Sequence, residues 1–100
     1  MDQNMEVAAS AENDQRAIAD LLLFMVKALA DYPDDVKVQF VSDEDGSAFE
    51  VRANDADLGL LIGKKGQTAR ALESIVNSNR KRTGRHFHLD IVGTGEEKRD

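Results

Sequence analysis

The sequence predicts a single α+β domain with the element order α-β-β-α-α-β, in which a three-stranded mixed sheet carries three helices on one face. A chain of 100 residues, 41% of them hydrophobic, is long enough for one modest core. Helical hydrophobic periodicity comes first, over residues 14–30, and strand-like alternation follows over residues 36–41 and 49–53. A further alternating segment, residues 87–91, comes after an apolar region with helical spacing, which predicts a helical crossover before the last strand.

The first helix is expected to begin at Asp14, a good N-cap residue, and to end at Ala30, because Tyr32-Pro33 stops it. Leu23 and Phe24 fall outside its main apolar stripe. They either widen the core face of a small protein or form a second contact surface for another protein. The stripe that should lie on the sheet consists of Ile18, Leu21, Leu22, Met25 and Leu29.

Three segments are expected to form the sheet. Residues 36–41 alternate as a half-buried strand does, and an acidic hairpin loop over residues 42–47 follows them. Residues 49–53 should run antiparallel to the first strand. Residues 87–91 should pair parallel to residues 49–53, because the connection between them is a helical crossover.

The crossover, residues 58–76, reads LGLLIGKKGQTARALESIV and is expected to contain two helices. The first, over residues 58–62, is too short to be stable without packing. Between the helices lie Gly63 and Gly66, which can adopt backbone angles that bulky residues avoid. The second helix carries one apolar stripe, formed by Ala69, Leu72, Ile75 and Val76.

The glycine-bracketed loop between these helices is a predicted anion site. The free N–H groups that open the second helix carry the positive end of its dipole, and Lys64 and Lys65 add two full charges. Neither glycine has a side chain that would block a ligand. This combination indicates a site for a phosphate backbone. The alternative is a tight corner between two helices, with lysines that serve only solubility.

Ile-Gly-Lys-Lys-Gly between two short helices is the GXXG signature of the KH domain. The longer stretch LGLLIGKKGQTARAL resembles the small bacterial KH proteins of the KhpA type, and the strand order resembles their type II fold. The resemblance covers residues 15–92. It implies a module without catalytic activity that clamps about four nucleotides of single-stranded RNA or DNA. It also implies a homodimer, or a heterodimer with a Jag-type (KhpB) RNA-binding protein.

From this resemblance we expect a single-stranded RNA-binding protein that acts as an RNA chaperone or post-transcriptional regulator in a bacterial cytoplasm. Two alternatives stay open. One is a protein-interaction or dimerisation module that works with a larger RNA-binding partner, and the other is a single-stranded DNA binder. In either nucleic-acid reading, Leu60 and Ile62 are candidates for an apolar floor under the bases. Leu61 is a further candidate, although the sequence does not show which side it faces.

The distribution of charge favours nucleic acid more than the net charge of −6 does. Residues 1–35 hold eight acidic side chains and two basic ones, whereas residues 63–85 hold seven basic side chains and one acidic one. A basic region inside an acidic chain predicts modest affinity with strong salt dependence. The candidate nucleic-acid-binding residues are Leu60, Leu61, Ile62, Gly63, Lys64, Lys65, Gly66, Arg70, Arg80, Lys81, Arg82 and Arg85.

The two ends of the chain are expected to lie outside the domain. Residues 1–13 are predicted to be a disordered acidic tail, which leaves open a role as a competitor for the basic region. The KH domain is expected over residues 14–92, and residues 93–100 are expected to be a flexible tail. The longest apolar run is too short to span a membrane, and the acidic start does not resemble a signal peptide.

Catalytic and metal sites are not supported by the sequence. His86, His88 and Asp90 lie two residues apart on one strand, but no fourth metal ligand has a convincing position. These histidines are either outward strand residues or partners for bases beside a nucleic-acid groove. The segment GLLIGK is one residue short of a P-loop, and the chain has no cysteine. We therefore expect no cofactor and no metal.

Overall fold

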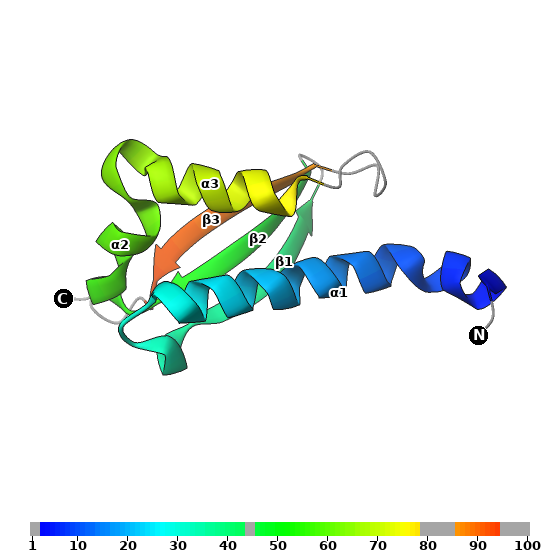
Figure 1. Ribbon diagram of the computed structural model, residues 1–100, viewed down its shortest axis with the longest axis horizontal. Helices are drawn as coiled ribbons and strands as arrows, with labels where there is room; N and C mark the ends of the chain where they lie inside the picture. The colour runs from blue at the N-terminus through cyan, green and yellow to red at the C-terminus, as the bar shows by residue number, and fades with distance from the viewer. Residues whose placement is uncertain (1–2, 44–45, 79–85, 95–100) are drawn as a thin grey trace.

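The computed structural model describes residues 3–43, 46–78 and 86–94, with only the backbone given for residues 3–13 and 43. Within these ranges it contains the predicted order α-β-β-α-α-β, so the fold-class prediction is confirmed (Figure 1). The elements are α1 (Gln3–Leu29), β1 (Lys37–Asp43), β2 (Gly46–Ala53), α2 (Leu58–Ile62), α3 (Gln67–Val76) and β3 (Phe87–Gly93), with short 3-10 turns η1 (Pro33–Asp35), η2 (Asp55–Asp57) and η3 (Lys64–Gly66).

The sheet has the order β1-β2-β3, and α1 and α3 cross the same face of it (Figure 1). β1 pairs antiparallel with β2, and β2 pairs parallel with β3, as predicted. This register brings Phe40, Phe49 and Phe87 together. The ring centroids of Phe49 and Phe87 are 5.0 Å apart, and those of Phe40 and Phe49 are 5.4 Å apart. An aromatic cluster therefore joins the three strands where α1 packs on them.

The face of α1 that packs on the sheet differs from the predicted stripe. Ile18, Leu22 and Val26 are buried, so the row of residues four apart lies on the sheet. Leu21 and Leu29 were expected in this stripe but are exposed. The physical reason is that α1 has more apolar residues than one row can bury, and the sequence does not show which row faces the sheet.

The start of α1 also differs from the prediction, since the helix begins at Gln3 and Asp14 is not its N-cap. Residues 3–13 belong to this helix, and they are rich in Ala, Glu, Gln and Met, which are good helix formers. This end of α1 extends beyond the sheet (Figure 1). The division into a tail, a domain over residues 14–92 and a second tail stays a prediction. Among the described residues, none of the helices combines the length and hydropathy needed to span a bilayer.

A buried carboxylate ties the end of α1 to the start of α2. Asp57 is 1% exposed, and its two carboxylate oxygens accept hydrogen bonds from the backbone N–H groups of Asp31 and Tyr32, each at 3.0 Å. Asn54 caps η2 by accepting a bond from the N–H of Ala56. Because α2 has only five residues, these anchors hold it in position beside the core.

Candidate nucleic-acid interface

Three of the four residues Gly63–Gly66 in the loop between α2 and α3 have a positive φ. Gly63 ends α2 with φ 81° and ψ 169°, and Gly66 precedes α3 with φ 73°. These are the two positions where the sequence predicts glycine to be needed. Lys65 also has a positive φ of 55°, which the sequence did not indicate and which costs about 1 kcal/mol in a residue with a side chain.

The two glycines are needed for different reasons. A Cβ atom on Gly63 would collide with the Thr68 side chain and would lie 2.7 Å from the backbone nitrogen of Thr68. The loop is therefore packed tightly on the first turn of α3. A Cβ atom on Gly66 would meet only the end of the Arg70 side chain, at 3.1 Å from Nη1. Gly66 is required by its backbone angle rather than by lack of space.

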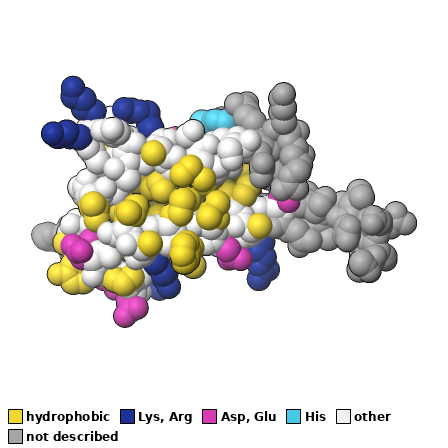
Figure 2. Space-filling model, in the orientation of Figure 1, with side chains coloured by type: hydrophobic (Ala, Val, Ile, Leu, Met, Phe, Trp, Pro, Cys, Tyr) yellow, Lys and Arg dark blue, Asp and Glu magenta, His cyan; other side chains and the backbone are white. Residues whose placement is uncertain are grey.

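The start of α3 presents positive charge to solvent. No side chain caps this helix, because the residue at its N-cap position is Gly66. Lys64 and Lys65 are exposed beside it, and the Arg70 guanidinium approaches Gly66. Lys and Arg side chains gather at the corner where α2 meets α3 (Figure 2). The backbone dipole and three cationic side chains thus act at one corner of the molecule.

The apolar residues before the loop point in different directions. Leu60 and Ile62 are exposed, at 46% and 38%, so both can contact a ligand beside the loop. Leu61 is completely buried in the core, so the expectation that it contacts nucleic acid is wrong. The reason is geometric: successive residues of a helix are about 100° apart, so only the middle one of the three faces the sheet.

A cleft runs from this corner along α3 to the start of β3. It has a volume of about 500 Å³. Arg70 lies both in the cleft and beside Gly66, so the cleft continues from the loop. The lining residues are Arg70, Glu73, Ser74, Asn77, Ser78 and His86. A cationic corner that opens into a polar cleft suits a charged backbone with bases to one side.

Comparison with known proteins identifies the family. A family model described as "KhpA/KhpB, KH domain" matches residues 19–91. The chain belongs to the KhpA/KhpB family of KH domains. The resemblance inferred from the GXXG loop is thereby confirmed.

The matches to relatives in the KhpA/KhpB family cover most of both chains. The chain is 41% identical over 75 residues to "RNA-binding protein KhpA" of Leifsonia xyli, a match that covers 75% of this chain and 96% of the relative. It is 33% identical over 73 residues to "RNA-binding protein KhpA" of Borreliella burgdorferi, covering 73% and 89%. A crystal structure of Aquifex aeolicus Era is similar over 77% of this chain and 30% of that protein, with a TM-score of 0.52 and 18% identity, which shows a shared fold.

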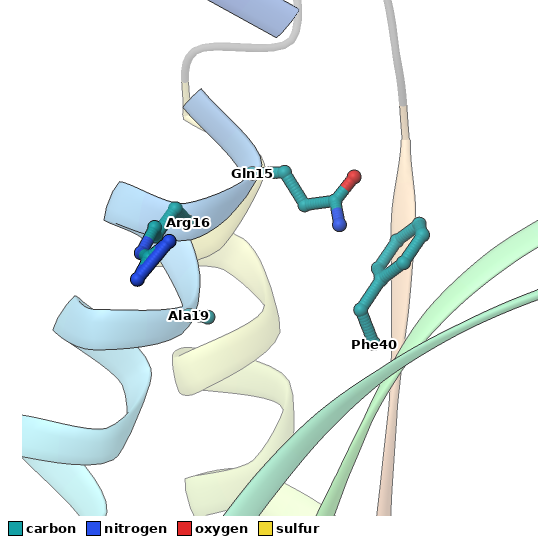
Figure 3. Close-up of a pocket in the computed structure, with 4 residues that line it drawn as sticks. All are labelled: Gln15, Arg16, Ala19 and Phe40. Atoms are coloured by element: carbon teal, nitrogen blue, oxygen red, sulfur yellow. The ribbon is translucent and has the colours of Figure 1, made fainter. Parts of the chain in front are cut away.

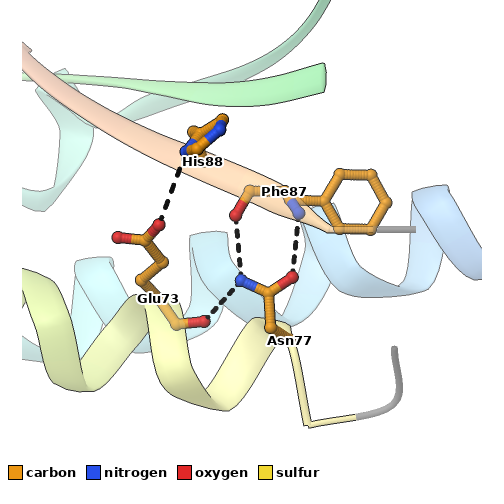
Figure 4. A network of polar contacts seen from close by, with 4 residues as sticks. All are labelled: Glu73, Asn77, Phe87 and His88. Carbon is orange, nitrogen blue, oxygen red and sulfur yellow. Dashed lines mark hydrogen bonds and ion pairs between the residues drawn. The ribbon is translucent and has the colours of Figure 1, made fainter. Parts of the chain in front are cut away.

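One residue of the KH-domain cleft was missed by sequence reasoning. The side-chain amide nitrogen of Asn77 donates to the carbonyls of Glu73 and Phe87, at 3.0 and 2.9 Å. Its oxygen accepts a bond from the N–H of Phe87 at 2.8 Å. Asn77 thus fixes the start of β3 against the end of α3 (Figure 4). The sequence shows only that poor helix formers begin there, so it carries no signal for this long-range contact.

His86, which precedes β3, lines the same KH-domain cleft, and His88 of β3 lies beside Glu73 of that cleft. Nδ1 of His88 is 3.8 Å from a carboxylate oxygen of Glu73 on α3 (Figure 4). The ring of His86 lines the cleft and meets the ring of His88 edge-on at 5.2 Å. Within the described ranges, the structure has no group of three or more His, Asp or Glu side chains placed to hold a metal ion.

Four of the predicted KH-domain site residues lie outside the described residues: Arg80, Lys81, Arg82 and Arg85. A second hollow, of about 350 Å³, lies between α1 and β1 and does not include the loop. There the Gln15 side chain extends toward the Phe40 ring, Ala19 lies beside it, and Arg16 points away (Figure 3). Since its only cation points away from the ring, this hollow is a weaker match to nucleic acid than the cleft beside α3.

Proposed function

We propose that this chain binds single-stranded RNA through the Gly63–Gly66 loop and the cleft between α3 and β3, without catalysing a reaction. The observation that carries the proposal is the loop geometry. Two glycines with positive φ bracket two exposed lysines, and the second glycine precedes a start of α3 that no side chain caps. The KhpA/KhpB relatives carry the name "RNA-binding protein", which supports the same conclusion.

In this proposal the loop holds the phosphates. Backbone N–H groups at the start of α3 donate to phosphate oxygens, and the helix dipole adds to the attraction. Lys64 and Lys65 neutralise two phosphates, and Arg70 extends the track along α3. Gly63 and Gly66 allow the RNA strand to approach the backbone of the loop, because glycine has no side chain to block it. The bases then lie against Leu60 and Ile62 and enter the cleft.

Binding of this kind is consistent with a role as an RNA chaperone or post-transcriptional regulator in the cytoplasm. Phosphate contacts carry most of the affinity and no sequence information. The affinity is therefore modest and spread over many RNA sequences. The acidic remainder of the chain, with its net charge of −6, limits indiscriminate binding.

Fluorescence anisotropy with a labelled, unstructured RNA tests the proposal. The variant Lys64→Asp/Lys65→Asp reverses two charges at the loop and leaves both glycines in place. Lys37→Asp/Arg52→Asp is the matched control, because these two exposed cations face each other across β1 and β2, away from the loop. We expect the wild type and the control to bind, with affinity that falls as salt rises, and the loop variant not to bind.

Equal binding by the two variants would contradict the proposal, and circular dichroism melts check that both are folded. The same titration with DNA of matched sequence separates an RNA-binding protein from a single-stranded DNA binder, since only RNA offers a 2′-hydroxyl. We expect tighter binding to RNA. Tighter binding to DNA would favour the alternative.

The exposed apolar face of α1 favours a second function, which is pairing with another copy of the chain. Phe24 is 71% exposed, and an apolar surface extends across this face of the molecule (Figure 2). Leu23 is half-buried against the core, so the predicted Leu23–Phe24 surface is only partly correct. The exposed residues recur at spacings of four, three and four, as in a coiled-coil seam. They are Ala17, Leu21, Phe24 and Ala28 on α1.

An antiparallel pair of α1 helices would bury this seam and place Asp20 of one copy near Lys27 of the other. Light scattering tests it with Phe24→Lys, and with Val41→Lys as a control at an exposed apolar residue on the sheet. We expect the mass of a dimer for the wild type and the control, and of a monomer for Phe24→Lys. A monomeric wild type would contradict self-pairing and direct attention to a larger KhpB-type partner.

A further inference from the structure

The charge along α3 changes sign within one helical turn, between Arg70 and Glu73. Arg70 lies beside the loop, and Glu73 follows it in the same cleft. We propose that Glu73 selects the base that enters the cleft, favouring bases with an exocyclic amino group over uracil. This inference rests on the proposed RNA-binding function and adds a base preference to it.

Glu73 is in the wrong place to contact a phosphate. Its side chain is 31% exposed, so its charge is partly removed from solvent and repels a phosphate more strongly than a fully hydrated carboxylate would. Lys64, Lys65 and Arg70 attract the phosphates to the loop end of the cleft. An RNA strand whose phosphates contact these cations must therefore turn a base edge, rather than a phosphate, toward Glu73.

Two other polar side chains of the cleft near Glu73 already make hydrogen bonds within the protein. Asn77 makes three hydrogen bonds to backbone groups of Glu73 and Phe87, which occupy its amide nitrogen and oxygen. The hydroxyl of Ser78 donates to the carbonyl of Ile75 at 2.8 Å. Among the described residues that line the cleft, Glu73 is thus the side chain that can only accept hydrogen bonds and still faces a ligand.

The Glu73 carboxylate lies beside His88 of β3. His88 lies 3.8 Å from one of its oxygens, and Asn77 fixes the backbone carbonyl of the same residue (Figure 4). His86 lines the cleft with an exposed ring on which a base can stack. A base stacked there and directed into the cleft presents its hydrogen-bonding edge to the Glu73 carboxylate.

Bases differ sharply in what they offer to such an acceptor. Cytosine, adenine and guanine each carry an amino group that donates to a carboxylate, as glutamate accepts from the N4 amino group of cytosine in known complexes. Uracil has carbonyl oxygens on both sides of its one N–H group, and their lone pairs repel the carboxylate. A well-placed contact of this kind gives about fivefold discrimination or more.

Anisotropy titrations of labelled oligocytidine and oligouridine of equal length test the inference in the wild type, Glu73→Gln and Ser74→Ala. We expect the wild type to bind oligocytidine about fivefold more tightly or better. In Glu73→Gln the ratio should approach one, because an amide both donates and accepts and so also bonds to uracil. Ser74→Ala changes the same cleft without removing the carboxylate, and it should keep the wild-type ratio.

The quantity to compare is the ratio of the oligocytidine affinity to the oligouridine affinity. Removing a negative charge raises both affinities, so neither one alone tests the base preference. A wild-type ratio near one, or an unchanged ratio in Glu73→Gln, would overturn the base preference while leaving the proposed RNA binding intact. Absence of binding to either oligonucleotide by the wild type would overturn the proposed function and the inference with it.

Discussion

Replacing the three glycines of the α2–α3 region one at a time should give three different stabilities. Gly63 combines φ 81° and ψ 169°, a region that only glycine adopts readily, with a position 2.7 Å from the Thr68 nitrogen for any added Cβ. Strain and collision together predict a loss of about 3 kcal/mol or more for Gly63→Ala. Gly66→Ala should lose about 1 kcal/mol, because its left-handed angle is strained but the Arg70 side chain can move.

Gly59→Ala is the control in this series, since nothing lies within 4 Å of the added Cβ and the residue lies inside α2. Alanine there should stabilise the protein by about 0.5–1 kcal/mol, because glycine is the poorer helix former. Thermal unfolding monitored by circular dichroism ranks the stabilities of the three variants directly. For a domain of this size, Tm should fall by roughly 12–24 °C in Gly63→Ala and by roughly 4–8 °C in Gly66→Ala.

Equal losses in Gly63→Ala and Gly66→Ala would refute this reasoning. Such a result would mean that the contact between Gly63 and the first turn of α3 does not constrain the loop, and that only the backbone angles matter. Urea denaturation at constant m-value would confirm that the changes lie in stability rather than in the compactness of the unfolded state.

Three further predictions concern residues that support the loop and the cleft. Asp57→Ala should cost about 3 kcal/mol in urea denaturation, because it leaves two backbone N–H groups without their partner, and Asp57→Asn should cost less. Asn77→Ala should cost about 2 kcal/mol, and the Phe87 amide should exchange hydrogen faster in NMR experiments. Leu61→Ala should cost about 3 kcal/mol by leaving a core cavity, whereas Leu60→Ala should change stability by less than about 0.5 kcal/mol and weaken RNA binding.

The sheet was predictable because its signal is local. Alternation at Phe49 and Val51 shows which side of the central strand is buried, and strand geometry then dictates the register of its neighbours. The loop was predictable because Gly63 and Gly66 bracket two lysines, and few local structures other than a tight turn with exposed cations fit this combination. Both signals are carried by residues next to one another in the chain.

The errors and omissions arise where the outcome depends on distant parts of the chain. Leu21 and Leu61 are equally apolar, but α1 turns the first outward and α2 turns the second into the core. Neither orientation follows from helical periodicity alone when apolar residues surround the helix. Asn77 and Glu73 acquire their roles only once β3 lies beside α3. Lys65 adopts a positive φ that its side chain does not favour, and nothing in its own residue type indicates this.

The parallel pairing of β2 with β3 has a consequence for how the protein folds. It joins residues far apart in sequence, such as Phe49 and Leu89, and the whole of α2, the loop and α3 lies between them. Closing so long a crossover costs chain entropy that is recovered only when the two strands are in register. His86, which lines the cleft and leads into β3, is therefore not in place until this slow, non-local step is complete. Refolding monitored by circular dichroism and by RNA capture should consequently show the same rate.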